Sequence, residues 1–144
     1  MYGNKMKDFT IISELGWGSY GTVYKVESTK DGKIYVLKKI NLKHLKPKHQ
    51  EAAVKEAQIL KTINHPHVIK YFTSFMEDGC LHILMEYADG GDLYELLKSQ
   101  KKKWKYFSEK DLWIFAYEIL LGLEYLHSKN VIHWDIKTLN IFIS

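Results

Sequence analysis

The chain has 144 residues, enough for one domain, with 46% hydrophobic and 26% charged residues. These values exclude a disordered, collagenous or fibrous protein, and the net charge of +4 is mild. The single cysteine, Cys80, excludes an internal disulfide framework and fits a reducing compartment. Because no apolar stretch is long enough to span a bilayer and the first residues do not resemble a secretory signal, we expect a cytoplasmic protein without a membrane helix.

The first 45 residues predict strands and turns, because apolar and β-branched residues cluster at 11–15, 22–26 and 34–40. Pro47 suits the first turn of a helix, and an apolar stripe at helical spacing continues to Ile63. The dipeptide His65-Pro66 is expected to end this helix. Two further strands are predicted at 68–75 and 81–87, joined by a turn at 78–79.

Helices dominate the rest of the chain. Asp92 or a neighbour is expected to cap a short helix, and Ser108 with Asp111 resembles a capping box at the start of a longer one. Apolar residues then recur every three or four positions from Leu112 to Leu126, so one face of the longer helix is expected to be buried. This order of elements predicts a small α+β lobe followed by the start of a helical lobe.

Residues 16–23 form a G-x-G-x-x-G-x-V motif. Glycines let the backbone fold closely over phosphates, where a Cβ would obstruct the approach. A dinucleotide-binding loop shares the first six positions but opens a helix, whereas residues 22–26 continue as a strand. The motif therefore favours a strand–turn–strand that covers nucleotide phosphates, with an ordinary glycine hairpin as the alternative.

Lys38 lies in a predicted strand, two residues after Val36. Because side chains alternate along a strand, both residues share one face, where a small apolar group could contact adenine while the ammonium reaches the phosphates. Glu56, on the first predicted helix, is the acid expected to hold this ammonium for phosphoryl transfer. Glu51 is the rival, and a solvated helix face would also explain either carboxylate.

Residues 133–140 read H-W-D-I-K-T-L-N between two apolar runs. At this spacing an aspartate accepts the proton of a substrate hydroxyl and an asparagine binds a magnesium ion. Asp135 and Asn140 occupy these two positions. The alternative is a chance polar loop.

Together these four motifs resemble the eukaryotic protein kinases over residues 9–143. Lys137 matches the serine/threonine-specific form, and residues 35–38 and 135–142 look most like the NIMA-related group. The resemblance implies an α+β, protein-kinase-like fold with a five-stranded antiparallel N-lobe sheet and one main helix. It places the N-lobe and hinge at about residues 9–88, and the first helices and catalytic loop of the C-lobe at 89–144.

The same resemblance implies transfer of the ATP γ-phosphate to serine or threonine hydroxyls of protein substrates, with magnesium. Asp135 would orient and deprotonate the hydroxyl, and Lys137 would face the transferred phosphoryl group. Lys38, held by Glu56, would bind the α and β phosphates. Asn140 would bind one magnesium ion.

Further nucleotide contacts are implied in the glycine loop, the sheet, the hinge and the catalytic loop. They are Leu15, Gly16, Gly18 and Gly21 in the loop; Val23 and Val36 above the adenine and Ile141 below it; the gatekeeper Met85; Glu86 and Ala88 of the hinge; Asp92 at the ribose; and Lys38 and Asn140 at the phosphates and metal.

Two departures from the family pattern are present. Trp134 replaces an arginine that pairs with a phosphorylated activation loop, so this regulation is expected to be lost. No Asp-Phe-Gly sequence occurs in the 144 residues, so we expect a domain truncated before its second metal-binding carboxylate, with turnover reduced by orders of magnitude. Without further helices, Phe115, Ile119, Leu123 and Leu126 are expected to form an exposed apolar patch.

Two alternatives differ in class from an active kinase. The first is a catalytically inactive pseudokinase fragment that acts as a nucleotide- or protein-binding module. The second is a nucleic-acid binder using the lysines at 101–103 and 105, a run that would also suit anionic lipid but is better explained as a solvated connector. We expect ATP and protein substrates as partners, with no nucleic acid and no membrane. The sequence assigns no oligomeric state. Besides the cytoplasm, the family resemblance implies a cytoskeletal or nuclear location.

Overall fold

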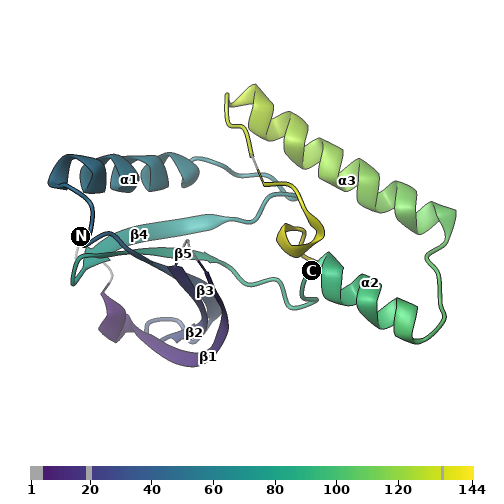
Figure 1. Ribbon diagram of the computed structural model, residues 1–144, viewed down its shortest axis with the longest axis horizontal. Helices are drawn as coiled ribbons and strands as arrows, with labels where there is room; N and C mark the ends of the chain where they lie inside the picture. Colours follow the sequence, from purple (N-terminus) through teal and green to yellow (C-terminus); the bar gives the residue numbers. More distant parts are fainter. Residues whose placement is uncertain (1–4, 19–20, 134) are drawn as a thin grey trace. The chain divides into compact units, whose positions relative to one another are not determined.

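The computed structural model describes residues 5–18, 21–133 and 135–144. The chain divides into two compact units, whose elements are labelled in Figure 1. The strand unit comprises Met1–Asn64 and Ile69–Tyr87, and the helical unit comprises His65–Val68 and Ala88–Ser144.

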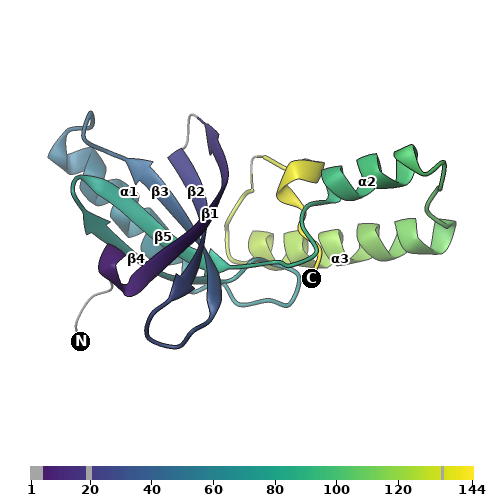
Figure 2. The same ribbon diagram turned by 90° about the horizontal axis from the view of Figure 1, so that it is seen from below.

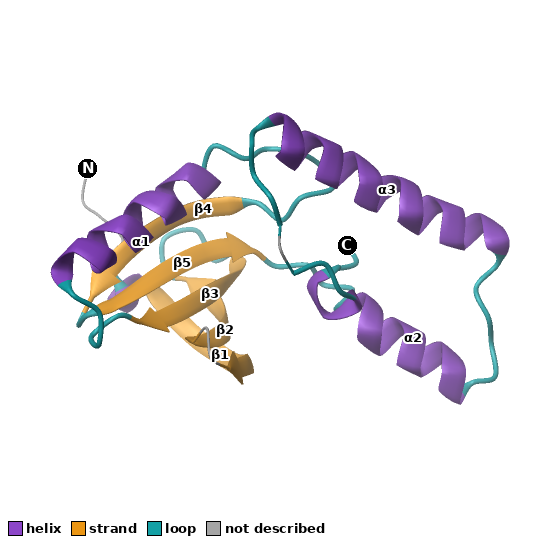
Figure 3. Ribbon diagram, turned by 45° about the horizontal axis from the view of Figure 1, so that its top comes forward, coloured by secondary structure: helices purple, strands orange, loops and turns teal. Residues whose placement is uncertain are grey.

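A five-stranded antiparallel sheet forms most of the strand unit (Figure 3). Its strands are β1 (Phe9–Gly18), β2 (Gly21–Ser28), β3 (Ile34–Asn41), β4 (Tyr71–Glu77) and β5 (Cys80–Glu86). They are ordered β1-β2-β3-β5-β4, and a short 3₁₀ helix, η1 (Met6–Asp8), precedes β1. The predicted five-stranded sheet with one main helix is confirmed.

Each face of the sheet buries an apolar cluster, because successive side chains of a strand point to opposite faces. One cluster consists of Phe9, Val26, Leu37 and Leu84. The other consists of Leu42, Ala57, Leu81 and Ile83. The second cluster includes α1 (Pro47–Leu60), which lies against the sheet beside β4 (Figure 3).

The start of α1 agrees with the sequence, since Pro47 occupies the first turn. Its predicted end was wrong, because the helix stops at Leu60 and not at His65-Pro66. The Thr62 hydroxyl donates a 2.8 Å hydrogen bond to the Ile59 carbonyl, satisfying a terminal acceptor while the chain turns. This turn buries Ile63, which completes the predicted apolar stripe from outside the helix.

The predicted start of the fourth strand was also wrong. Val68 forms only an isolated bridge with His65, and β4 begins at Tyr71. The loop 65–68 belongs to the helical unit and not to the sheet that its composition suggested. Similarly, β5 ends at Glu86 and leaves Tyr87 outside the strand.

The helical unit contains α2 (Leu93–Lys102), α3 (Glu109–Ser128) and the 3₁₀ helix η2 (Thr138–Asn140), all visible in Figure 2. Both predicted caps are confirmed. Asp92 accepts a hydrogen bond from the Glu95 backbone, and Ser108 forms a reciprocal capping box with Asp111. No described helix is long and apolar enough to cross a bilayer.

The predicted exposed patch on α3 was wrong in its residues. Leu126 is buried, and Phe115 meets Phe107 edge to face with ring centroids 5.5 Å apart. Ile119 and Leu123 are half-buried, so most of the predicted stripe is at least partly covered. Leu112, predicted to lie on the buried face, is instead exposed, as are Trp113, Tyr117 and Leu120.

Candidate active site

Register in the strand unit places the predicted adenine and phosphate contacts on one face of the sheet. Val23 pairs with Lys38, and Lys38 pairs with Ile83 on the next strand. In the neighbouring row, Val36 pairs with Met85. Directly paired residues share a face, and positions two apart share it too. The result is a face on which the apolar side chains of Val23, Val36 and Met85 lie together with the ammonium groups of Lys25 and Lys38.

Lys38 is half-buried on this face, and burial lowers the pKa of its ammonium. A nearby anion would oppose this shift, because it favours the charged form. Glu56, the predicted partner, is exposed on α1 in the same unit. The ion pair between these residues stays a prediction.

The glycine loop is the hairpin between β1 and β2. Gly16 pairs with Val23, and Gly18 pairs with Gly21. The φ angle of Gly21 is +109°, and a Cβ there would collide with the Lys39 carbonyl. By contrast, a Cβ at Gly16 would meet no heavy atom within 4 Å, so the backbone there is open to approach.

A bulge lies on the β1 side of the same loop. The register shifts between Glu14 and Gly16, so Leu15 lies in a bulge and is half-exposed. The loop residues Ser19 and Tyr20 lie outside the described part of the chain. The predicted contact of Leu15 with nucleotide stays a prediction.

The segment after β5 is held by two sets of contacts. The Glu86 N–H donates to the Lys70 carbonyl at 2.9 Å, and the Lys70 N–H donates back to Glu86 Oε2 at 3.1 Å. The Lys25 ammonium donates to the Tyr87 hydroxyl at 3.1 Å and lies 4.3 Å from the ring centroid. Ala88, the other predicted hinge residue, begins the next part of the helical unit.

Sequence reasoning missed Lys25 and Tyr87. The signal available was strand alternation, since Lys25 is two residues after Val23 and directly opposite Val36. A lysine on the predicted adenine face of β2 could therefore have been identified. Its partner could not, because the contact spans 62 positions of sequence.

Three polar residues of the predicted catalytic loop lie together in the helical unit. Lys137 Nζ lies 2.9 Å from Asp135 Oδ2. The Asn140 amide donates to that same oxygen at 3.0 Å and to the Asp135 carbonyl at 2.9 Å. Helix η2 makes this possible, because it turns Asn140 back over the loop and lets its N–H donate to the Lys137 carbonyl at 2.8 Å.

These contacts define the acidity of Asp135. The hydrogen bond from Lys137 is the largest cause that lowers the pKa of this carboxyl, and Asn140 and the nearby His133 contribute in the same direction. Asp135 is therefore a carboxylate at neutral pH, on an exposed loop. Trp134, on which the predicted loss of regulation depends, lies outside the described residues.

Asp92 and Ile141 lie side by side at the start of α2. The Leu93 N–H donates to the Ile141 carbonyl at 2.8 Å, and Asp92 forms a bridge with Phe142. Asp92 Oδ1 accepts the 2.9 Å hydrogen bond that caps α2. The predicted ribose contact would use the remaining acceptor capacity of this carboxylate.

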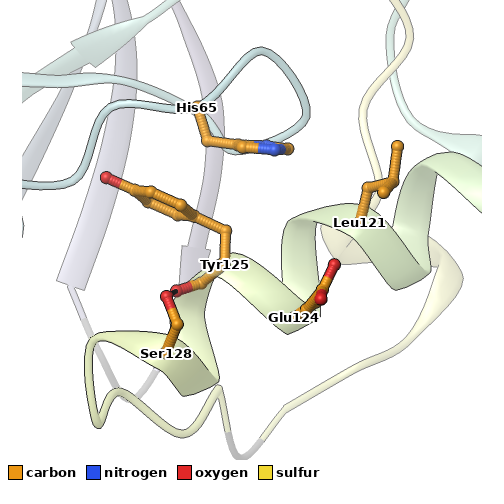
Figure 4. Close-up of a pocket in the computed structure, with 5 residues that line it drawn as sticks. All are labelled: His65, Leu121, Glu124, Tyr125 and Ser128. Carbon is orange, nitrogen blue, oxygen red and sulfur yellow. Dashed lines mark hydrogen bonds between the residues drawn. The ribbon is translucent and has the colours of Figure 1, made fainter.

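A separate hollow of about 240 Å³ lies on α3 (Figure 4). The residues that line it are His65, Leu121, Glu124, Tyr125 and Ser128. The His65 ring stacks on Tyr125 with centroids 4.9 Å apart, which anchors the loop 65–68 to the helix. None of the predicted site residues lines this hollow.

Comparison with known families decides the assignment. The model of the protein kinase domain matches residues 9–144. The chain belongs to the protein kinase family. Asp135, Lys137 and Asn140 of this kinase domain are thus the predicted catalytic-loop residues of a known family, and the resemblance stated from the motifs is confirmed.

Relatives of this kinase domain include several NIMA-related kinases. It is 37% identical over 139 residues to probable serine/threonine-protein kinase nek3 of Dictyostelium discoideum. It is 41% identical over 131 residues to mouse Nek4 and 37% identical over 139 residues to human Nek5, both serine/threonine-protein kinases. These alignments cover 96%, 90% and 96% of the chain, but only 12%, 16% and 19% of the respective relatives.

Proposed function

We propose that this kinase domain takes part in transfer of the γ-phosphate of ATP to serine or threonine hydroxyls of protein substrates. The single observation that carries the proposal is the Asp135 carboxylate with Lys137 and Asn140 around it. This set provides an anion for the accepting hydroxyl, a cation for the transferred charge and an amide for a metal. Relatives with serine/threonine kinase names support the same substrate class.

The adenine and phosphate contacts are proposed on the sheet face with Val23, Val36 and Lys38. Two branched aliphatic side chains offer a flat apolar surface to a base, and a phosphate anion beside the half-buried Lys38 ammonium would favour its charged form. The open backbone at Gly16 supports a close approach of phosphate oxygens. Met85, paired with Val36, would border the same base.

The donor set fits magnesium, which prefers oxygen ligands. The Asn140 side-chain nitrogen makes two contacts to Asp135, which directs the amide oxygen to be the group offered to a cation. When bound, magnesium would neutralise phosphate charge. Asn140 is the residue of this chain that we propose as its ligand.

Asp135 is proposed to orient the substrate hydroxyl first and to take its proton late. The low pKa keeps the carboxylate ionised, so it accepts a hydrogen bond from the hydroxyl throughout the neutral range. Because a weakly basic carboxylate accelerates the reaction little by removing the hydroxyl proton early, its main contribution is to position the hydroxyl. Lys137, 2.9 Å from Asp135, is close enough to stabilise charge on the transferred group.

The lobe boundaries follow from this assignment. We propose that residues 9–88 form the N-lobe and hinge, and that residues 89–144 form the beginning of the C-lobe. Protein substrates and ATP are the proposed partners.

The decisive experiment measures radiolabelled phosphate transfer from ATP to a generic protein substrate. Asp135→Asn keeps the shape of the side chain but removes its charge, and we expect transfer to fall at least about a hundredfold, as for loss of a general base. Asp78→Asn is the matched control, because Asp78 is exposed in the β4–β5 turn of the strand unit. Transfer that survives Asp135→Asn unchanged would refute the proposed role.

Nucleotide binding separates the active enzyme from an inactive module. Fluorescent ATP titrated into the protein and into Asp135→Asn is expected to bind both similarly, since the carboxylate is proposed to act on the hydroxyl. Binding without any transfer by the parent protein would instead identify a nucleotide-binding module. If the protein does not bind ATP, both the active enzyme and the nucleotide-binding module are contradicted.

A further inference from the structure

The last residues of α2 and the start of the loop that leads to α3 are basic and aromatic. Residues 101–106 contain four lysines, Trp104 and Tyr106, and no acidic residue. Every side chain in this segment, defined here as the basic-aromatic connector, is exposed. The exposed fractions of Trp104 and Tyr106 are 86% and 89%. Aromatic rings that pack against the rest of a protein are far less exposed.

The backbone holds Trp104 in an unfavourable conformation. Its φ angle is +53°, in the left-handed region that glycine normally occupies after a helix. The Trp104 N–H donates to the Lys101 carbonyl at 3.2 Å, and the Lys105 N–H donates to the Gln100 carbonyl at 3.1 Å. These two bonds form the helix-ending motif that glycine usually completes. A large aromatic residue is therefore displayed at a fixed position at a conformational cost.

The connector also has a shaped surface. A hollow of about 160 Å³ is lined by Lys101, Trp104, Lys105 and Tyr106. It is smaller than the roughly 300 Å³ at which drug-sized ligand sites begin, but it joins two ammonium groups to two aromatic rings. The next aromatic residue, Phe107, behaves differently because it packs on Phe115 of α3. The rings of Trp104 and Tyr106, by contrast, are exposed.

We propose that the basic-aromatic connector docks on a bilayer surface that contains anionic lipids. Tryptophan and tyrosine favour the membrane–water interface, where the ring is partly buried and its polar atom stays hydrated. The lysines beside them complement the negative charge of the headgroups. Single-stranded nucleic acid is less well matched, because it needs a groove that follows several nucleotides, whereas this charge is confined to one turn.

The position of the connector in the helical unit leaves the catalytic loop accessible. It begins in the last turn of α2, whereas η2 contacts α2 near its N-terminal end, as Figure 2 shows. Ten helical residues separate these ends by about 15 Å. A membrane bound at the connector would therefore contact the end of α2 that is distant from η2. Docking there would not require phosphoryl transfer.

Co-sedimentation with vesicles tests this proposal directly. We expect the protein to bind phosphatidylcholine vesicles that contain phosphatidylserine, to bind pure phosphatidylcholine weakly, and to be released by high salt. Replacing the four connector lysines by glutamine should weaken binding by up to several hundredfold, because each basic residue near such a surface contributes roughly fivefold. Replacing Lys43, Lys46, Lys48 and Lys55, which are exposed in the strand unit, makes the same charge change and should weaken it much less.

Trp104→Gly separates loss of the ring from loss of the fold. Glycine suits the conformation at this position, so thermal stability should be retained while vesicle binding falls roughly tenfold with the lost apolar contact. Trp17→Ala, which removes an equally exposed ring from the strand unit, should bind like the parent. Equal binding by both lysine variants, no preference for anionic vesicles, or binding only to single-stranded DNA or an acidic peptide would overturn the proposal.

Discussion

The acidity of Asp135 is set by neighbours within five positions of the chain. Lys137 and Asn140 both reach its Oδ2 atom, at 2.9 and 3.0 Å. Such local geometry needs only one turn of 3₁₀ helix, η2, to form. This explains why spacing alone identified the cluster, whereas the Lys25–Tyr87 contact required the folded sheet.

At Gly21 the backbone lies so close to the Lys39 carbonyl that there is no room for a Cβ. Gly21→Ala combines a φ of +109° with a collision against the Lys39 carbonyl, so we expect a loss of about 2–4 kcal/mol in the free energy of unfolding. Gly32→Ala is the control, because its φ is +67° but its Cβ would meet no atom within 4 Å. It should cost only about 1 kcal/mol. Urea denaturation of both variants measures the difference, and equal losses would contradict the collision.

At the scale of elements, short-range signals predicted types better than boundaries. Pro47 and the Ser108–Asp111 pair marked true helix starts, because a capping interaction involves only adjacent turns. The end of α1 was predicted too late, since Ile63 is buried by tertiary packing without being helical. Likewise, Val68 has strand propensity but belongs to a loop of the helical unit.

The capping box of α3 allows a prediction for one element. Ser108→Ala removes the side-chain oxygen that accepts the Asp111 N–H at 3.1 Å, and should lower stability by about 1 kcal/mol. Ser108→Asn supplies another oxygen at the cap and should recover most of this loss. Thermal unfolding followed by circular dichroism compares the variants. An alanine variant as stable as the parent would mean that the box contributes nothing measurable.

At the scale of the whole molecule, His82 places a titratable ring inside the sheet core. It is almost fully buried and stacks on Phe75 with centroids 4.9 Å apart. Its Nδ1 has no hydrogen-bond partner within the described part of the chain. Burial, and secondarily the charge of Lys39, lowers the pKa of His82, while Glu77 and Asp78 act in the opposite direction.

Because the His82 ring is buried, we expect the protein to lose stability in mild acid. The unfolded chain takes up a proton at His82 near its ordinary pKa of about 6.5, whereas the folded protein takes it up only at lower pH. The contribution of His82 is therefore complete above pH ~6.5 and is lost as the pH falls below that value. Melting temperatures measured from pH 8 to pH 5 should fall in the acidic part of this range.

His82→Phe is the matched variant, because phenylalanine can stack on Phe75 without titrating. We expect stability at pH 8 to be unchanged or to rise by up to about 1 kcal/mol, since an unsatisfied polar atom is removed. Its melting temperature should depend less on pH than that of the parent. Identical pH profiles would assign the acid sensitivity to other groups.

The sequence by itself determined the element types, the helix starts, the kinase family and the Asp135 cluster, because each depends on contacts or spacings within a few residues. Only the tertiary structure decided which face of α3 is buried, where α1 ends and which tyrosine holds Lys25. These features arise from packing between segments far apart in the chain. Local pattern cannot specify such packing, because the same propensity is compatible with several partners.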